Sequence, residues 1–93
     1  MSDSVARHAR ISGVVQGVFF RASAQRQARQ LGVVGWVRNM ADGRVELYAE
    51  GPRLAVDQFM AWAAQGPAHA VVRAIDQNAV EAEGTYDDFA VRR

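Results

Sequence analysis

The spacing of apolar residues switches between two periods along this chain, and the order of the switches restricts the folds that it can form. Residues 7–14 alternate apolar and polar side chains, which is the period of a strand with one buried face. Residues 20–31 repeat apolar side chains every three or four positions and end at Gly32, which predicts an amphipathic helix. Residues 33–40 and 44–50 predict two strands, joined by a short loop through Asp42-Gly43 that is typical of a hairpin.

The second half of the chain shows the same change of period. Gly51-Pro52 ends the hairpin and begins a second predicted helix, because proline suits the first helical position. Gly66-Pro67 ends this helix, and a last strand is expected from about 70 to 80, with a bulge because its alternation is imperfect. The tail at 89–91 could add a short edge strand. The apolar stripe of the second helix consists of Val56, Phe59, Met60 and Ala63.

The resulting order is βαββαβ. We therefore predict an α+β fold, a ferredoxin-like sandwich with two helices on one face of a four-stranded antiparallel sheet. We expect residues 5–93 to form a single domain and residues 1–4 to be a disordered N-terminus. Proteins with this fold include enzymes, RNA binders and small-molecule sensors, so function has to be inferred from a site. In the strand at 44–50 the odd-numbered side chains would face the core, and those expected to face outward are Arg44, Glu46, Tyr48 and Glu50.

The composition excludes several kinds of chemistry. All eleven basic residues are arginine, and the chain has neither lysine nor cysteine. This excludes a Walker-type phosphate lysine, Schiff-base catalysis, disulfides, a cysteine nucleophile and thiolate metal sites. No stretch approaches the roughly 18 apolar residues of a membrane span, which predicts a cytoplasmic protein. Residues 1–53 hold eight Arg and four acids (+4), and residues 54–93 hold three Arg and six acids (−3), so an anion site is expected in the first half.

The junction between the first strand and the first helix is the first candidate site. Gly17 allows the loop at 13–20 to curl tightly, and a loop that ends at a helix N-terminus offers unpaired amides and a positive dipole end to an anion. Arg21 falls in the first helical turn, where a cation opposes the dipole at a cost of roughly 0.3–1 kcal/mol. An arginine in that position is explained by an anionic ligand. It is equally explained by a solvated side chain, or by one paired with Asp42 or a carboxylate of the tail.

Asn39 is the second candidate. It ends a predicted strand where the hairpin turn begins, and asparagine suits turns without any functional role. Its side-chain amide could alternatively hold a water at a fixed angle, because it both donates and accepts hydrogen bonds. The predicted sheet order places the end of this strand beside the end of the first strand, and hence places Asn39 near Arg21.

Two stretches of the sequence together resemble the signatures of the acylphosphatase family. The arginine and the asparagine stand eighteen positions apart, as in that family, and the likeness covers nearly the whole chain after Val5. The departures are small: Phe19-Phe20 is one of several tolerated pairs, and residues 71–80 and 91–93 match only loosely. The two stretches are Gly13-x-Val15-Gln16-Gly17-Val18-x-Phe20-Arg21 and Leu31-Gly32-x-x-Gly35-Trp36-Val37-Arg38-Asn39-x-x-Asp42-Gly43-x-Val45-Glu46.

The resemblance implies hydrolysis of an acyl phosphate to a carboxylate and inorganic phosphate, with no metal and no cofactor. It implies that Arg21 and Asn39 are the catalytic residues. Its implied partners are the small-molecule acyl phosphate and inorganic phosphate, with no nucleic acid and no membrane, and we expect a monomer. The backbone amides that the resemblance assigns to the phosphate are those of Val15, Gln16, Gly17, Val18, Phe19 and Phe20.

Two alternatives remain at the level of sequence. The first is a ferredoxin-like binding module for RNA or a small molecule, although the strand at 44–50 carries one aromatic and mixed charges on its outward face. The second is an acylphosphatase-like domain of a larger carbamoyl-transfer enzyme. We interpret the remaining conspicuous side chains as structural or as surface charge, namely His8, His69, Trp36, Trp62, Arg10 and Arg38.

Overall fold

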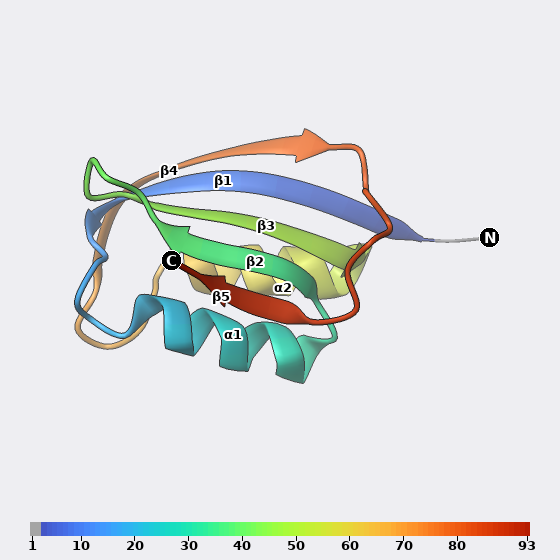
Figure 1. The fold of residues 1–93 in the computed structure, drawn as a ribbon, viewed down its shortest axis with the longest axis horizontal. Coiled ribbons are helices and arrows are strands. Elements are labelled where there is room, and N and C mark those ends of the chain that lie inside the picture. The colour runs from blue at the N-terminus through green and yellow to red at the C-terminus, as the bar shows by residue number, and fades with distance from the viewer. Residues whose placement is uncertain (1–2) are drawn as a thin grey trace.

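The computed structural model describes residues 3–93, and its elements follow the predicted order with one addition at the C-terminus (Figure 1). Ser4, placed by the sequence analysis in a disordered segment, is the first residue of β1 and pairs with Pro52; residues 1–2 lie outside the described part. The elements are β1 (Ser4–Val14), α1 (Phe20–Leu31), β2 (Val34–Asn39), β3 (Val45–Pro52), α2 (Arg53–Ala63), β4 (Val71–Val80) and β5 (Phe89–Arg92).

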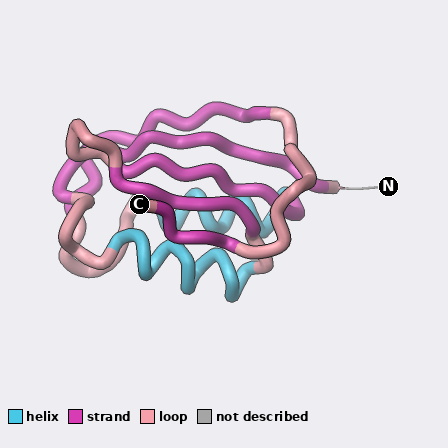
Figure 2. Tube along the Cα trace, viewed as in Figure 1, coloured by secondary structure: helices cyan, strands magenta, loops and turns pink. Residues whose placement is uncertain are grey.

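The strands form one five-stranded sheet in the order β4-β1-β3-β2-β5. The pairs of β1 with β3, β1 with β4 and β2 with β3 are antiparallel, whereas β5 runs parallel to β2 along its edge. Both helices lie on the same face of this sheet (Figure 2). The ferredoxin-like prediction is therefore confirmed, and the tail forms the fifth strand that the sequence left optional.

The predicted irregularity in the fourth strand is present. The pairing of β1 with β4 shifts between Ser12 and Gly13, whose partners are Ala74 and Val72, so Arg73 is an extra residue on β4. An extra residue of this kind is a β-bulge, and it bends the strand and raises its local twist. The bulge lies at the end of β1 that leads into the candidate loop.

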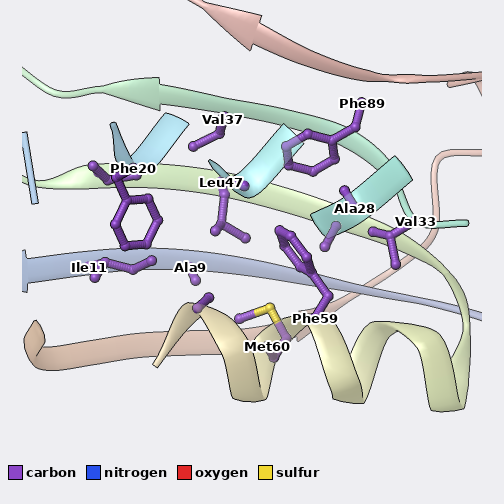
Figure 3. Packing of buried hydrophobic residues seen from close by; sticks show 14 of the residues in the cluster. Ala9, Ile11, Phe20, Ala28, Val33, Val37, Leu47, Phe59, Met60 and Phe89 are labelled. Carbon is purple, nitrogen blue, oxygen red and sulfur yellow. The ribbon is translucent and has the colours of Figure 1, made fainter. Parts of the chain in front are cut away.

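A single apolar core lies between the helices and the sheet (Figure 3). The predicted stripe of α2 is buried in it, and α1 contributes Phe20, Ala24 and Ala28 at the spacing of one helical face. Gly32 ends α1 in the left-handed conformation that glycine adopts without strain. The core is completed from the strands and the loops by Ala9, Ile11, Val15, Val33, Val37, Val45, Leu47, Ala49 and Phe89.

The opposite face of β3 carries the predicted outward-facing side chains, but it is covered by other parts of the chain. Glu46, Tyr48 and Glu50 alternate outward as expected, but each is no more than 6% exposed. The segment 81–88 crosses this face: the amide of Glu83 donates to the Tyr48 hydroxyl at 2.9 Å and to Glu50 Oε1 at 3.1 Å. The Tyr86 ring packs 5.3 Å from the Tyr48 ring. The burial of Tyr48 and Glu50 could not be predicted from the strand alone, because it depends on a segment more than thirty residues further along the chain.

None of the helices within residues 3–93 is long and apolar enough to cross a membrane.

Candidate active site

The loop between β1 and α1 presents an unusual run of free backbone amides. Among residues 3–93, no backbone or side-chain acceptor is found for the amides from Gln16 to Ala22; the next amide, that of Ser23, donates to the Phe19 carbonyl at 3.0 Å. Phe19 is the N-cap of α1 but makes no side-chain cap hydrogen bond, and the first turn of the helix holds no acidic residue. The unpaired amides and the positive end of the helix dipole therefore lie together at one place, ready to bind an anion.

The conformation of this loop requires two left-handed residues. Gly17 has φ 74°, and a Cβ there would meet nothing within 4 Å, so glycine is used for its conformation rather than for space. Phe19 has φ 64° and ψ 25°, and it is the one non-glycine residue with positive φ in residues 3–93. A bulky side chain in this region is a genuine outlier, and such outliers concentrate at functional sites.

Arg21 lies in the first turn of α1, and its guanidinium Nη1 donates to the backbone carbonyl of Arg92 at 3.2 Å. Within residues 3–93 it forms no ion pair. Asp42, one of its partners considered from the sequence, instead pairs with Arg44 at 2.8 Å. The arginine is thus held by a neutral acceptor of the tail, and its charge is not matched by a carboxylate.

Asn39 is the last residue of β2 and pairs with Val45 of β3, so it belongs to the strand rather than to the turn. The turn follows it: the Met40 amide donates to the Arg44 carbonyl at 2.7 Å, and the Gly43 amide donates to the Met40 carbonyl at 3.2 Å. Figure 1 shows this hairpin turn, the β1–α1 loop and the C-terminus gathered at one end of the molecule. The side chain of Asn39 is partly buried there.

Arg21 and Asn39 line one pocket of about 320 Å³. Of the loop residues expected to hold phosphate, four line the pocket, whereas Gln16 and Val18 do not. Three further lining residues were not predicted from the sequence: Ala22 and Gln25, in the first two turns of α1, and Val91 in β5. The complete lining is Val15, Gly17, Phe19, Phe20, Arg21, Ala22, Gln25, Asn39 and Val91.

Gln16 does not line the pocket, and its side chain contacts the hairpin turn that follows β2. Its Nε2 donates to the Met40 carbonyl at 2.8 Å and to the Arg44 carbonyl at 2.9 Å. One amide therefore ties the β1–α1 loop to both ends of the hairpin turn that follows Asn39. The sequence carries no signal for this role, because an isolated glutamine in a loop is ordinarily solvated.

Gln25 holds the terminal strand against α1. It lies one helical turn after Arg21, lines the pocket, and its Nε2 donates to the Phe89 carbonyl at 2.9 Å. One turn further on, Arg29 forms a bidentate pair with Asp88 at 2.9 and 3.0 Å, and its hydrogen bonds lower the pKa of that carboxyl. The spacing of four from Arg21 to Gln25 and again to Arg29 was the available signal, since these side chains share one helix face.

The arginines next to Asn39 on the sheet are already paired. Arg38 donates to Glu46 Oε1 at 2.6 Å, His8 Nε2 lies 2.7 Å from Glu46 Oε2, and Arg10 lies 3.8 Å from the same oxygen. Burial would raise the pKa of Glu46, but the hydrogen bonds from Arg38 and His8 hold it below its ordinary value. Beside this cluster, burial and the hydrogen bond to Glu50 raise the pKa of Tyr48 to about 12.

No group of three or more histidine, aspartate or glutamate side chains that could hold a metal ion is found between residues 3 and 93. The polar groups that line the pocket are the unmatched guanidinium of Arg21, the carboxamides of Asn39 and Gln25, and backbone amides that have no acceptor within residues 3–93. This set can bind an anion and orient a polar molecule beside it.

Comparison with known proteins agrees with this geometry. The sequence matches the family model described as Acylphosphatase over residues 7–91. The chain belongs to the acylphosphatase family. Over 86 residues it is 49% identical to an acylphosphatase from Methylococcus capsulatus, covering 92% of this chain and 94% of that protein. An acylphosphatase from Roseiflexus sp. is 48% identical, with 98% of each chain covered.

Solved acylphosphatases share the fold. The structure of an acylphosphatase from Coxiella burnetii matches with a TM-score of 0.92 at 39% identity, covering 97% of this chain and 94% of that one. The family and the fold expected from the two sequence signatures are thus confirmed.

Proposed function

We propose that this chain hydrolyses the carboxyl–phosphate bond of an acyl phosphate, releasing a carboxylate and inorganic phosphate. The observation that carries the proposal is the common pocket. In an acylphosphatase-family chain, Arg21 and Asn39 line the same cavity as a loop whose amides from Gln16 onward have no acceptor within residues 3–93.

The phosphoryl group binds first in this scheme. Its outer oxygens accept hydrogen bonds from the amides of the loop at 15–20 and from the guanidinium of Arg21. During phosphoryl transfer negative charge spreads over these oxygens, so preorganised positive potential can supply most of the catalysis. Arg21 suits this role because its present partner is a carbonyl, which leaves the positive charge available to the substrate.

A water held by the carboxamide of Asn39 then attacks. The water oxygen forms a bond to phosphorus as the bond from phosphorus to the acyl oxygen breaks, and the electron pair leaves with the carboxylate. A carboxylate is a good leaving group, so no general acid is needed, and the water proton passes to the phosphate. Val15 stands six residues before Arg21, where cysteine-dependent phosphatases carry their nucleophile, and the chain has no cysteine. We therefore propose direct attack by water, without a phosphoenzyme.

Two substitutions test these roles. We expect Arg21→Ala to lower turnover of an aromatic acyl phosphate roughly 10³-fold or more and to weaken inhibition by inorganic phosphate, because it removes a charge that stabilises phosphoryl transfer. Asn39→Ala should abolish turnover while inhibition by inorganic phosphate is retained. Arg26→Ala, at an exposed position of α1 outside the pocket, is the matched control and should retain activity.

Near-normal turnover by Arg21→Ala would refute its assignment. An equal loss of turnover and of phosphate inhibition in Asn39→Ala would contradict the water-orienting role. The reaction class is tested with a chelator present, by comparing an acyl phosphate with a phosphate monoester. We expect hydrolysis of the acyl phosphate alone, and a requirement for added metal would contradict the scheme.

A further inference from the structure

The mouth of the pocket carries an exposed aromatic side chain that phosphate binding does not explain. Phe19 is 78% exposed, and its left-handed backbone makes phenylalanine an unfavourable choice at that position. Only its backbone amide takes part in the proposed phosphate cradle. Phe19 therefore combines two unfavourable features, an apolar ring in solvent and a strained backbone. This combination indicates that the ring itself has a ligand.

A second exposed apolar side chain lines the same pocket from a distant part of the sequence. Val91 on β5 is 39% exposed, and Gln25 and Arg29 fix β5 against α1 through the contacts described above. An exposed phenylalanine and an exposed valine, seventy-two residues apart in the chain, therefore border one cavity.

The size and charge of the cavity are consistent with an organic group beside the phosphate. A phosphoryl group fills only a fraction of about 320 Å³, a volume in the range of sites for small organic molecules. The lining contains no aspartate or glutamate, so nothing there would pair with an amine on the bound acyl group. Its polar members, Arg21, Asn39 and Gln25, have the partners or roles already described.

We propose that Phe19 and Val91 form the subsite for the acyl group, and that they make this chain selective for acyl phosphates with an aromatic or large apolar acyl group. The inference rests on the proposed function and names the substrate class of the same site. With the phosphate on the loop amides, the acyl group extends toward the mouth of the pocket. There the ring of Phe19 and the methyl groups of Val91 are shielded from water on binding, which favours apolar acyl groups over small ones.

The test compares kcat/KM for benzoyl phosphate and for acetyl phosphate, and uses the ratio of the two values. Phe19→Asn removes the ring but keeps a residue type that tolerates the left-handed conformation. Val91→Thr replaces a methyl group by a hydroxyl at nearly constant shape in a strand. Leu54→Asn, at a 70% exposed position on α2 outside the pocket, is the matched control.

We expect the unmodified protein to favour benzoyl phosphate by about tenfold or more, the range in which apolar pockets discriminate. Phe19→Asn should lower the ratio by about tenfold and Val91→Thr by about threefold, while Leu54→Asn leaves it unchanged. A second measurement does not need turnover: the ratio of the inhibition constants of phenylphosphonate and methylphosphonate should change in the same order.

The outcomes separate the two proposals. If the unmodified protein hydrolyses neither acyl phosphate, the proposed function fails. If it hydrolyses both, and neither Phe19→Asn nor Val91→Thr changes either ratio relative to Leu54→Asn, the acyl subsite is refuted and the function stands. Equal losses on both substrates in Phe19→Asn would assign the residue to the shape of the loop and would also overturn the inference.

Discussion

We predict that the side chain of Gln16 holds the β1–α1 loop, which contains the proposed phosphate-binding amides, against the strand that carries Asn39. The perturbation is Gln16→Met, which keeps the length of an unbranched side chain but removes its donors. It deletes the hydrogen bonds from Nε2 to the carbonyls of Met40 and Arg44, at 2.8 and 2.9 Å. No other side-chain hydrogen bond or ion pair joins the loop to the turn within residues 3–93.

The expected loss in the free energy of unfolding depends on the hydrogen bonds that each carbonyl keeps in Gln16→Met. The Arg44 carbonyl still accepts from the Met40 amide at 2.7 Å, and the Met40 carbonyl still accepts from the Gly43 amide at 3.2 Å. Neither oxygen is left without a donor, so the loss is that of two ordinary hydrogen bonds, about 1–3 kcal/mol in the free energy of unfolding. For a domain of this size that lowers Tm by roughly 4–8 °C per kcal/mol.

Turnover should fall as well, because Asn39 directly precedes the turn that Gln16 holds. A displacement of about 1 Å in a positioning group can reduce the rate on the order of 10²-fold, so we expect a decrease of about 10- to 100-fold. Thermal unfolding and kcat with an aromatic acyl phosphate are measured on the same preparations. Gln77→Met, on an exposed position of the edge strand β4, is the control. If the two variants have the same Tm and the same kcat, the bracing role of Gln16 is wrong.

Three further predictions concern the scaffold around the site. Gly35→Ala should lower the free energy of unfolding by at least about 3 kcal/mol. The added Cβ would lie 1.9 Å from the Tyr48 carbonyl oxygen, and the backbone at this position has φ +137°. An unchanged midpoint of urea unfolding would contradict this prediction. Glu46 should contribute stability above its ordinary pKa of 4.5, and this contribution is lost as pH falls through its lower folded pKa, since the unfolded chain then binds the extra proton. Glu46→Gln should flatten that acid limb in chemical unfolding, and a limb unchanged in shape would show that other carboxylates cause it. Deletion of residues 92–93 removes the carbonyl that orients Arg21 and should reduce kcat about tenfold. Arg92→Ala keeps that carbonyl and should retain activity. Equal kcat values for the deletion and for Arg92→Ala would exclude this contact from catalysis.

The hydrophobic periods predicted the six principal elements because each period is a local property of the chain. The exposure of β3 was not predictable in this way. Its outward residues are polar or amphipathic, which indicates solvent when the strand is considered alone. In the folded chain Glu46 is covered by basic side chains of β1 and β2, and Glu50 by the segment 81–88. The tail was likewise only an optional strand, because its four residues depend on pairing with β2.

The candidate site could be predicted where a residue is unfavourable in its local secondary structure. Arg21 stands out because a cation in the first turn of a helix opposes the helix dipole, and the structure places it at the predicted anion loop. Glutamine is an ordinary residue at positions 16 and 25, so the sequence gives no signal there. Only the fold brings backbone carbonyls within reach of the side-chain amides of Gln16 and Gln25. Val91 is in the same position, since an apolar residue near the C-terminus gives no sign that it lines a pocket.

Helix α1 carries two arginines whose side chains have different partners. Arg21 and Arg29 lie on one face of the helix, and both contact the last segment of the chain. Arg29 meets the carboxylate of Asp88, so its charge is matched and its contribution is to hold the segment in place. Arg21 meets the carbonyl of Arg92, a dipole that can orient the guanidinium without neutralising it. A carboxylate in place of this carbonyl would compete with a phosphate for the guanidinium, and its negative charge would repel the phosphate. Positioning by a neutral acceptor would therefore leave the full charge of Arg21 for the phosphoryl group of the proposed substrate.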